Sequence, residues 1–178
     1  MKKEDKAIAE DRKKYLKEIK ELKAQLVKEP RFKMELYKQI AWAYGFLTFS
    51  VKSLAVGDRY EKVALEYMNK RIQRYPNNGQ YYADLAGLLE LFYYHIEDNP
   101  FRPEVAEIKK LYFKALRLGT ENDAGPWFVL AQIFYDQTEY ALKQAHKIDP
   151  VYYNEIVKRN DVTRPMTPFE CMYDEVKR

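Results

Sequence analysis

Two histidines and one cysteine are the side chains best suited to metal binding, acid–base catalysis or nucleophilic attack. His95 and His146 lie far apart, so they do not form the H-x-x-x-H spacing that places two imidazoles on one helix face. Cys171 has no histidine near it in sequence that could take up the thiol proton. These residues therefore predict no metal site, no cofactor and no covalent catalysis.

Paired carboxylates are the other candidates for acid–base chemistry, and they occur at residues 97–98 and 174–175. Neighbouring side chains point to different faces of a helix, so both pairs are interpreted as solvated surface charges. The sequence also lacks a glycine-rich phosphate loop, a G-x-S-x-G motif and a dinucleotide-binding fingerprint. We therefore expect a protein without enzymatic activity.

The composition favours a folded, all-α protein. The 178 residues are 47% hydrophobic and 33% charged, and only 6 Gly and 8 Pro interrupt them. Long stretches rich in Ala, Leu, Glu and Lys favour helix, and none alternates with the period of a strand. The charged N-terminus shows no signal segment and a single cysteine fits a reducing compartment, which predicts a cytoplasmic protein. The most apolar stretch, residues 40–57, contains Lys52 and is interpreted as a buried helix, not a membrane span.

Clusters of proline, glycine and asparagine divide the chain into helices. The pattern predicts a charged arm over residues 1–30, a helical domain over 31–160 and a C-terminal tail over 161–178. Gly119 is expected to end a helix. The expected helices cover residues 4–29, 31–54, 60–75, 80–96, 103–118 and 151–160, with a further helix that begins near Pro126.

The apolar residues of the N-terminal arm follow a heptad spacing. Ile8, Tyr15 and Leu22 lie seven apart, and Ile19 and Leu26 interleave with them. Two interpretations stay open: a helix that packs on the domain, or an arm for self-association or partner docking.

The basic excess of the chain is concentrated in the same arm. The net charge is +4, and residues 1–30 hold 10 Lys and Arg against 7 Asp and Glu, whereas the rest holds 21 against 20. Lys13, Lys14, Lys17 and Lys20 are therefore the candidate contacts for an alternative, nucleic-acid-associated function. Acidic residues lie among these lysines, which is more typical of a solvated helix face.

One spacing of four, three and five residues occurs three times, and its first three positions share a helix face. The helices before the second and third copies share a second pattern, in which a small residue lies among large ones. The three copies are Ala64, Met68, Arg71 and Pro76; Ile108, Tyr112, Ala115 and Thr120; and Thr138, Leu142, Ala145 and Pro150. The preceding pattern is Tyr82, Leu85, Ala86 and Leu89, and then Trp127, Leu130, Ala131 and Phe134, with a weaker version before the first copy at Ala41, Tyr44, Gly45 and Thr48.

With these spacings, residues 38–150 resemble degenerate tetratricopeptide repeats. The resemblance implies a stack of antiparallel helical hairpins, an α-solenoid, in which small residues allow close approach. The intervals between the two patterns are longer than in that family for the first two units and shorter for the third. The third unit is therefore either one continuous helix or two helices, the second starting at a capping box made by Asp136 and Glu139.

The resemblance also implies where a partner would bind, because tetratricopeptide proteins hold ligands on the concave face lined by their first helices. Some members of that family clamp a peptide carboxylate with Lys, Arg and Asn on this face, but none of these residue types stands at the corresponding positions of this chain. The residues carried over as a peptide- or helix-binding groove are Trp42, Phe46, Phe49, Gln80, Glu90, Phe128, Gln132 and Tyr135.

The sequence therefore predicts a non-enzymatic scaffold, adaptor or assembly subunit that binds another protein through an aromatic groove. Three alternatives stay open. The groove could be filled by the chain's own arm or tail, the basic arm could bind nucleic acid, or a helical pocket could bind a small molecule.

Overall fold

The computed structural model describes residues 3–94, 99–121, 124–151 and 153–154, and within these ranges it contains helices and no strands. The expected all-α class is therefore confirmed. The helices are α1 (Lys3–Lys28), the short 3₁₀ turn η1 (Pro30–Phe32), α2 (Lys33–Thr48), α3 (Leu54–Arg74), α4 (Gly79–Tyr93), α5 (Pro103–Leu118) and α6 (Ala124–Ile148).

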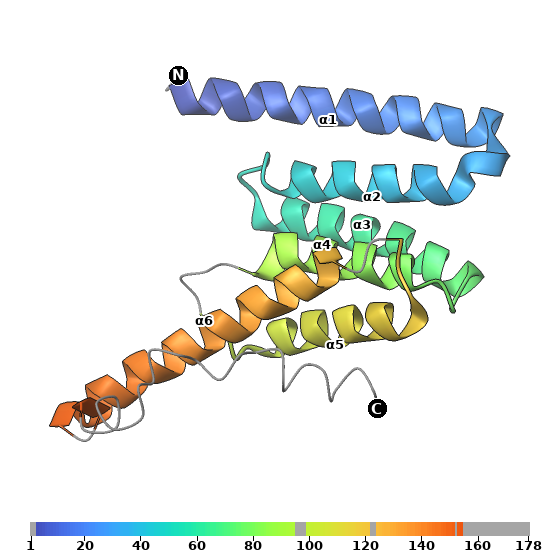
Figure 1. Cartoon of the computed structure of the whole chain (residues 1–178). Helices are drawn as coiled ribbons and strands as arrows, with labels where there is room; N and C mark the ends of the chain where they lie inside the picture. The colour runs from blue at the N-terminus through green and yellow to red at the C-terminus, as the bar shows by residue number, and fades with distance from the viewer. Residues whose placement is uncertain (1–2, 95–98, 122–123, 152, 155–178) are drawn as a thin grey trace.

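Successive helices lie side by side and run in alternating directions from α1 to α5 (Figure 1). The closest pairs are α2 with α3 and α4 with α5, and α2 also contacts α1 and α4. The last helix, α6, crosses α5 obliquely and extends beyond the stack (Figure 1). Among the described helices none is both long and apolar enough to cross a membrane.

The first two copies of the repeated spacing form the main core. Ala64 and Ala115 are completely buried, as is Ala86 of the preceding pattern, and such small side chains let helices approach closely. The third copy behaves differently, because Ala145 is exposed and Thr138 and Leu142 are only half-buried. The repeated spacing therefore specifies buried packing in the first two copies only.

The third unit is one continuous helix, α6, and not a pair of helices. The expected capping box is not used, because the Asp136 carboxylate accepts hydrogen bonds from the Tyr94 hydroxyl and from Gln132 Nε2 at 2.9 Å. A carboxylate with two such partners no longer competes for backbone amides, so the helix continues past Asp136.

The break after the second helix was predicted at the wrong place. α2 ends at Thr48 rather than residue 54, and α3 begins at Leu54 rather than residue 60. Gly57 does not end a helix, since its amide donates to the Ser53 carbonyl at 3.0 Å within the first turn of α3. Gly119, by contrast, ends α5 as expected with a φ of 81°.

The N-terminal helix packs on the domain. Ile19 and Leu22 are buried against α2, and Lys23 Nζ donates to the Tyr44 hydroxyl at 2.8 Å, which raises the pKa of Lys23. The heptad stripe of α1 is therefore partly buried within the chain itself, which supports the packing interpretation over a free arm.

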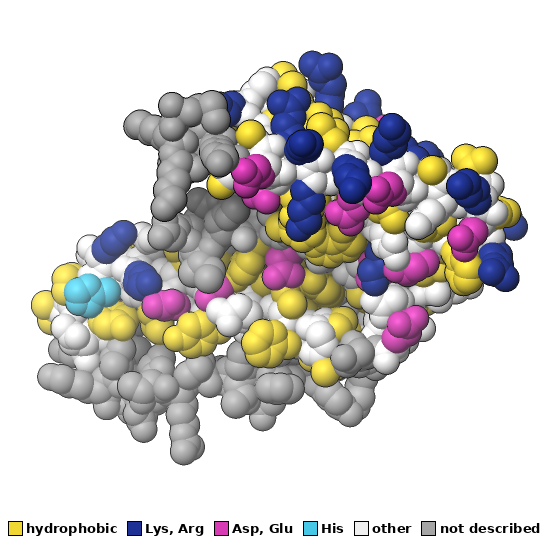
Figure 2. Space-filling view, turned by 90° about the horizontal axis from the view of Figure 1, so that it is seen from above, with side chains coloured by type: hydrophobic (Ala, Val, Ile, Leu, Met, Phe, Trp, Pro, Cys, Tyr) yellow, Lys and Arg dark blue, Asp and Glu magenta, His cyan; other side chains and the backbone are white. Residues whose placement is uncertain are grey.

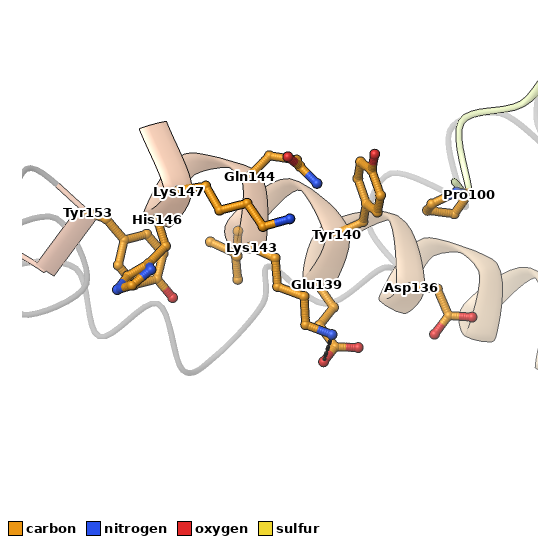
Figure 3. Close-up of a pocket in the computed structure, with 10 residues that line it drawn as sticks. Pro100, Asp136, Glu139, Tyr140, Lys143, Gln144, His146, Lys147 and Tyr153 are labelled. Carbon is orange, nitrogen blue, oxygen red and sulfur yellow. Dashed lines mark ion pairs between the residues drawn. The ribbon is translucent and has the colours of Figure 1, made fainter. Parts of the chain in front are cut away.

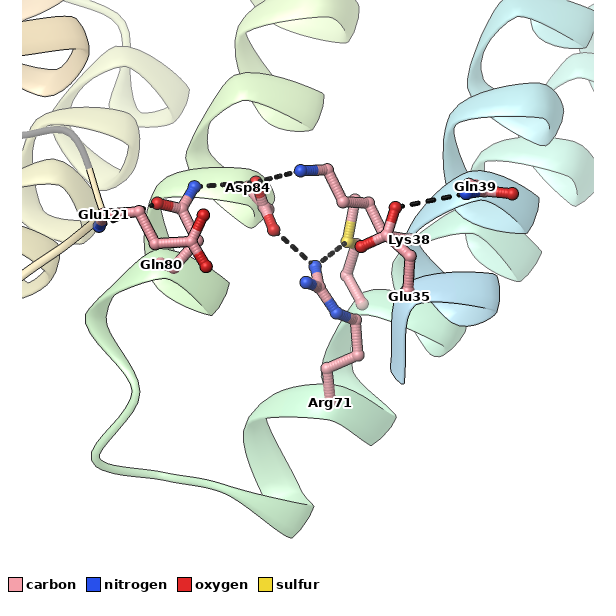
Figure 4. Close-up of polar contacts among 8 residues, drawn as sticks. Glu35, Lys38, Gln39, Arg71, Gln80, Asp84 and Glu121 are labelled. Atoms are coloured by element: carbon pink, nitrogen blue, oxygen red, sulfur yellow. Dashed lines mark hydrogen bonds and ion pairs between the residues drawn. The ribbon is translucent and has the colours of Figure 1, made fainter. Parts of the chain in front are cut away.

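A buried ion pair joins α2, α3 and α4 beneath the surface (Figure 4). Arg71 and Asp84 are 3% and 7% exposed, and their nearest nitrogen and oxygen atoms lie 2.6 Å apart. Lys38 Nζ approaches Asp84 at 3.2 Å, and Gln80 Nε2 donates to it at 3.1 Å. Because charged partners are costly to bury alone, this cluster fixes how the three helices meet.

Candidate functional site

A groove of about 610 Å³ lies between α2 and α4, and we call it the aromatic groove. Phe46 and Phe49 are 39% and 52% exposed, so the groove presents ring surface that the fold leaves in contact with solvent. Trp42 and Phe46 contact each other with ring centroids 5.8 Å apart. The groove is lined by Trp42, Phe46 and Phe49 from α2 and its C-cap, and by Gly87, Glu90, Leu91 and Tyr94 from α4 and its C-cap.

Gly87 keeps the floor of this groove open. A methyl group at its Cα would lie 3.6 Å from both the Trp42 ring and the Tyr112 hydroxyl, which is ordinary contact distance. A larger side chain at this position would project among the rings that line the groove. The depth of the groove therefore depends on a residue without a side chain.

Glu90 is the one acidic residue among the described residues that line the aromatic groove. Burial raises the pKa of its carboxyl group, and the hydrogen bond from the Tyr112 hydroxyl, 2.9 Å long, opposes that rise. No Lys or Arg is among the described lining residues. The described lining of the groove thus combines aromatic side chains with one carboxylate and no basic side chain to pair with it.

Tyrosine hydroxyls tie the surrounding helices to acidic residues. Tyr93 donates to Glu61 on α3, and Tyr94 donates to Asp136 on α6. Burial, followed by these hydrogen bonds, raises the pKa of both phenols. The adjacent pair therefore reaches two different helices, and Tyr94 connects the aromatic groove to α6.

The sequence-predicted groove residues fall into two groups. Trp42, Phe46, Phe49 and Glu90 lie together in the aromatic groove. Gln80 lies at the other end of α4, where its side chain bonds to Asp84 and accepts from the Glu121 amide at 3.3 Å.

The three predicted residues on α6 form a separate surface. Phe128 and Tyr135 are 74% and 53% exposed, and Gln132 donates to Asp136. None of the three lines the aromatic groove. They share one face of α6, and their nearest link to the groove is the hydrogen bond between Asp136 and Tyr94.

Two lining residues, Leu91 and Tyr94, were missed by sequence reasoning. They lie four and seven positions after Gly87, so they continue the same face of α4. The periodicity could have identified them, but the repeat pattern that guided the prediction ended at Glu90.

The remaining chemical candidates form no catalytic arrangement in the described part of the chain. His146 packs edge-on against Tyr153, with ring centroids 5.0 Å apart, beside a cavity of about 740 Å³ on α6 (Figure 3). That cavity carries both charge signs, including a Lys143–Glu139 ion pair of 2.9 Å. No three described His, Cys, Asp or Glu side chains are grouped to hold a metal ion. His95 and Cys171, with the carboxylate pairs at 97–98 and 174–175, lie outside the described residues.

The lysines of α1 do not form a surface of one charge. Lys13, Lys14, Lys17 and Lys20 are exposed, and Lys17 pairs with Glu21 at 3.8 Å. Basic and acidic side chains are intermixed on this side of the molecule (Figure 2). The helix face is therefore less suited to a polyanion than the count of its lysines implies.

Comparisons with protein-family models, with curated proteins and with solved structures found no match to the chain. What the protein binds therefore has to be inferred from its own residues.

Proposed function

We propose that this chain is a non-enzymatic protein-interaction module, built of helical hairpins stacked in a tetratricopeptide-like manner. The aromatic groove binds an apolar segment of another protein, a peptide or a helix, that presents a lysine or arginine to Glu90. The observation that carries this proposal is that three aromatic side chains from α2 and its C-cap line one groove together with an acidic residue of α4.

The aromatic rings supply the apolar part of the binding free energy. Fully burying one phenylalanine side chain contributes about 1.5–3 kcal/mol, and aromatic residues are common anchors at protein interfaces. Phe46 and Phe49 keep much of that surface exposed in the free chain. Covering them with a partner's apolar side chains is therefore favourable.

Glu90 supplies the preference for a basic partner. A cation over aromatic faces is attracted to the rings, and a carboxylate with limited solvent access attracts it further. The methylene stem of lysine or arginine can lie along the apolar wall while its charged end reaches the carboxylate. An acidic partner segment would be repelled by the same arrangement.

A displayed library of random peptides, selected on the full chain, tests the proposal. We expect selected peptides to combine apolar residues with at least one Lys or Arg. Their binding should weaken by about tenfold or more in Phe49→Ser, as for an interface anchor. Glu90→Gln should weaken the basic peptides and leave variants of them with norleucine at the basic position unchanged.

Phe128→Ser is the matched control, because Phe128 is also an exposed phenylalanine but lies on α6 outside the groove. It should leave the affinity of the selected peptides unchanged. Equal loss in Phe49→Ser and Phe128→Ser, or no loss in either, would contradict binding at the aromatic groove. Circular dichroism of each variant checks that the helices remain formed.

A further inference from the structure

A second groove, of about 570 Å³, lies where α1 turns into α2 and meets the end of α3, and we call it the basic groove. The described residues that line it include four basic side chains and no acidic one. These come from two segments far apart in sequence, one at the start of α2 and one at the end of α3. The lining consists of Pro30, Arg31, Lys33, Met34, Tyr37, Lys70, Gln73, Arg74 and Tyr75.

Among the described residues, the four cations have no acidic partner. In the described part of the structure, none of Arg31, Lys33, Lys70 and Arg74 takes part in an ion pair. All four are exposed, so a bound anion could reach them. Glu35, the acidic residue in the first turn of α2, accepts a hydrogen bond from Gln39 and does not line the groove.

The helix dipole favours only one of these four cations. Arg74 lies in the last turn of α3, where the negative end of the helix dipole favours a cation. Arg31 lies in η1 just before α2 and Lys33 is the first residue of α2, so both lie near the positive end of the α2 dipole, which disfavours cations. The cap residue of α2, Phe32, also provides no side-chain hydrogen bond to the first amides. Cations at a position that the helix dipole disfavours point to an anionic ligand.

Aromatic rings lie among these cations. Lys33 Nζ lies 5.5 Å from the centre of the Tyr37 ring, and the Arg74 guanidinium lies 6.0 Å from the centre of the Tyr75 ring. Tyr75 is 49% exposed and meets Tyr81 edge-on, so a face of its ring is accessible. Single strands of nucleic acid bind to surfaces of this kind, in which cations follow the phosphates and rings stack on bases.

We propose that the basic groove binds single-stranded nucleic acid. Phosphates pair with Arg31, Lys33, Lys70 and Arg74, and bases stack on Tyr75 and Tyr37. A duplex would keep its bases away from the tyrosines, and the carboxylates of an acidic peptide would pair with the cations without using the tyrosine rings. The basic groove and the aromatic groove share no described lining residue, so the two binding proposals can be tested independently.

Fluorescence anisotropy with labelled oligouridylate, titrated with the full chain at several salt concentrations, tests the proposal. We expect binding that weakens with salt, and a loss of about tenfold or more in the double variant Arg31→Ser/Arg74→Ser. The salt slope of that variant should fall by about one for each cation removed. Tyr75→Leu should weaken oligouridylate without weakening inorganic polyphosphate, because only the former has bases to stack.

The double variant Lys13→Ser/Lys17→Ser is the matched control, since it removes the same charge from exposed residues of α1. It should bind oligouridylate as the unaltered chain does. Equal losses in the two double variants would show a diffuse electrostatic effect and overturn the site. The proposal would also be overturned if the chain did not bind oligouridylate at low salt or bound a duplex of the same sequence more tightly. It would likewise be overturned if Tyr75→Leu weakened polyphosphate binding as much as oligouridylate binding.

Discussion

The two ends of α2 face two different kinds of groove. Its first half contributes Lys33 and Tyr37 to the basic groove. Its second half and C-cap contribute Trp42, Phe46 and Phe49 to the aromatic groove. Among the described lining residues, the basic groove has four cations and no carboxylate, whereas the aromatic groove has one carboxylate and no cation. One helix of 16 residues thus separates two surfaces of opposite chemistry.

The difference follows from where each groove lies in the stack. The aromatic groove lies between two packed helices, so apolar side chains and a half-buried glutamate form it. The basic groove lies at a corner where helices begin and end, so its charged side chains extend into solvent. Ligand binding should accordingly be nearly independent of salt at the first apart from the Glu90 contact, and strongly dependent on salt at the second.

The largest effect is expected from Arg71→Met, because Arg71 and Asp84 form the buried ion pair beneath α2, α3 and α4. Removing one partner of a buried pair costs about 3–5 kcal/mol, and the remaining contact with Lys38 should place this variant near the lower value. Unfolding in urea measures the loss. Since α2 lines both grooves, both peptide and oligouridylate binding should weaken.

An exposed ion pair gives the control for that variant. Lys110→Met removes the surface pair of Lys110 with Glu107 and should cost less than about 1 kcal/mol. The double variant Arg71→Met/Asp84→Leu should recover part of the loss, because no buried charge is then left without a partner. Lys38 also loses Asp84 in this variant, but its side chain is 33% exposed and can be solvated. A loss in Arg71→Met as small as that in Lys110→Met would show that the cluster does not hold the helices together.

Alkaline pH should destabilise the packing of the helices around the aromatic groove. Burial and the hydrogen bond to Glu61 raise the pKa of Tyr93 from 10.0 to about 12, and burial raises the pKa of Tyr94 and Tyr112 as well. The folded chain therefore holds these protons more tightly than the unfolded chain. Stability should be unchanged below about pH 10 and should fall as the pH rises towards about 12.

Unfolding in urea across this pH range measures the effect. Tyr93→Phe should reduce the fall in stability above about pH 10, because it removes one of the phenols whose protons the fold retains. A steeper fall in Tyr93→Phe than in the unaltered chain would contradict the assignment. Tyrosinate absorbance in the folded chain provides an independent reading of the same titration.

The smallest effect is expected from Gly87→Ala. The added methyl group would meet the Trp42 ring at 3.6 Å, and alanine favours helix over glycine by about 0.5–1 kcal/mol. The variant should therefore unfold at a slightly higher temperature. It should narrow the aromatic groove and weaken peptide binding, while oligouridylate binding stays the same.

Gly45→Ala is the comparison for that variant, because its methyl group would lie only 2.8 Å from Leu88 Cδ1. That contact requires the leucine to move, so the gain in helix propensity should be offset. If Gly45→Ala stabilised the chain more than Gly87→Ala, the packing described between α2 and α4 would be wrong.

Sequence periodicity predicted the helices well where they bury a regular apolar stripe. The expected helix over residues 103–118 matches α5, and Gly119 ends it as expected. The boundary near Gly57 was wrong, because glycine is tolerated in a first turn and the chain already breaks at residues 49–53. The candidate site was predicted in part, because a repeat pattern assigns residues to helix faces but does not show which faces meet.

The sequence by itself determined the helical class and the small and large residues that pack in the first two copies of the repeated spacing, because these depend on local propensity and period. Only the tertiary structure decided that α6 continues past Asp136, since that depends on a hydrogen bond from Tyr94, far away in the chain. Only the tertiary structure brought Arg31 and Lys33 beside Lys70 and Arg74. Contacts between distant segments depend on how helices stack, and no local pattern encodes them.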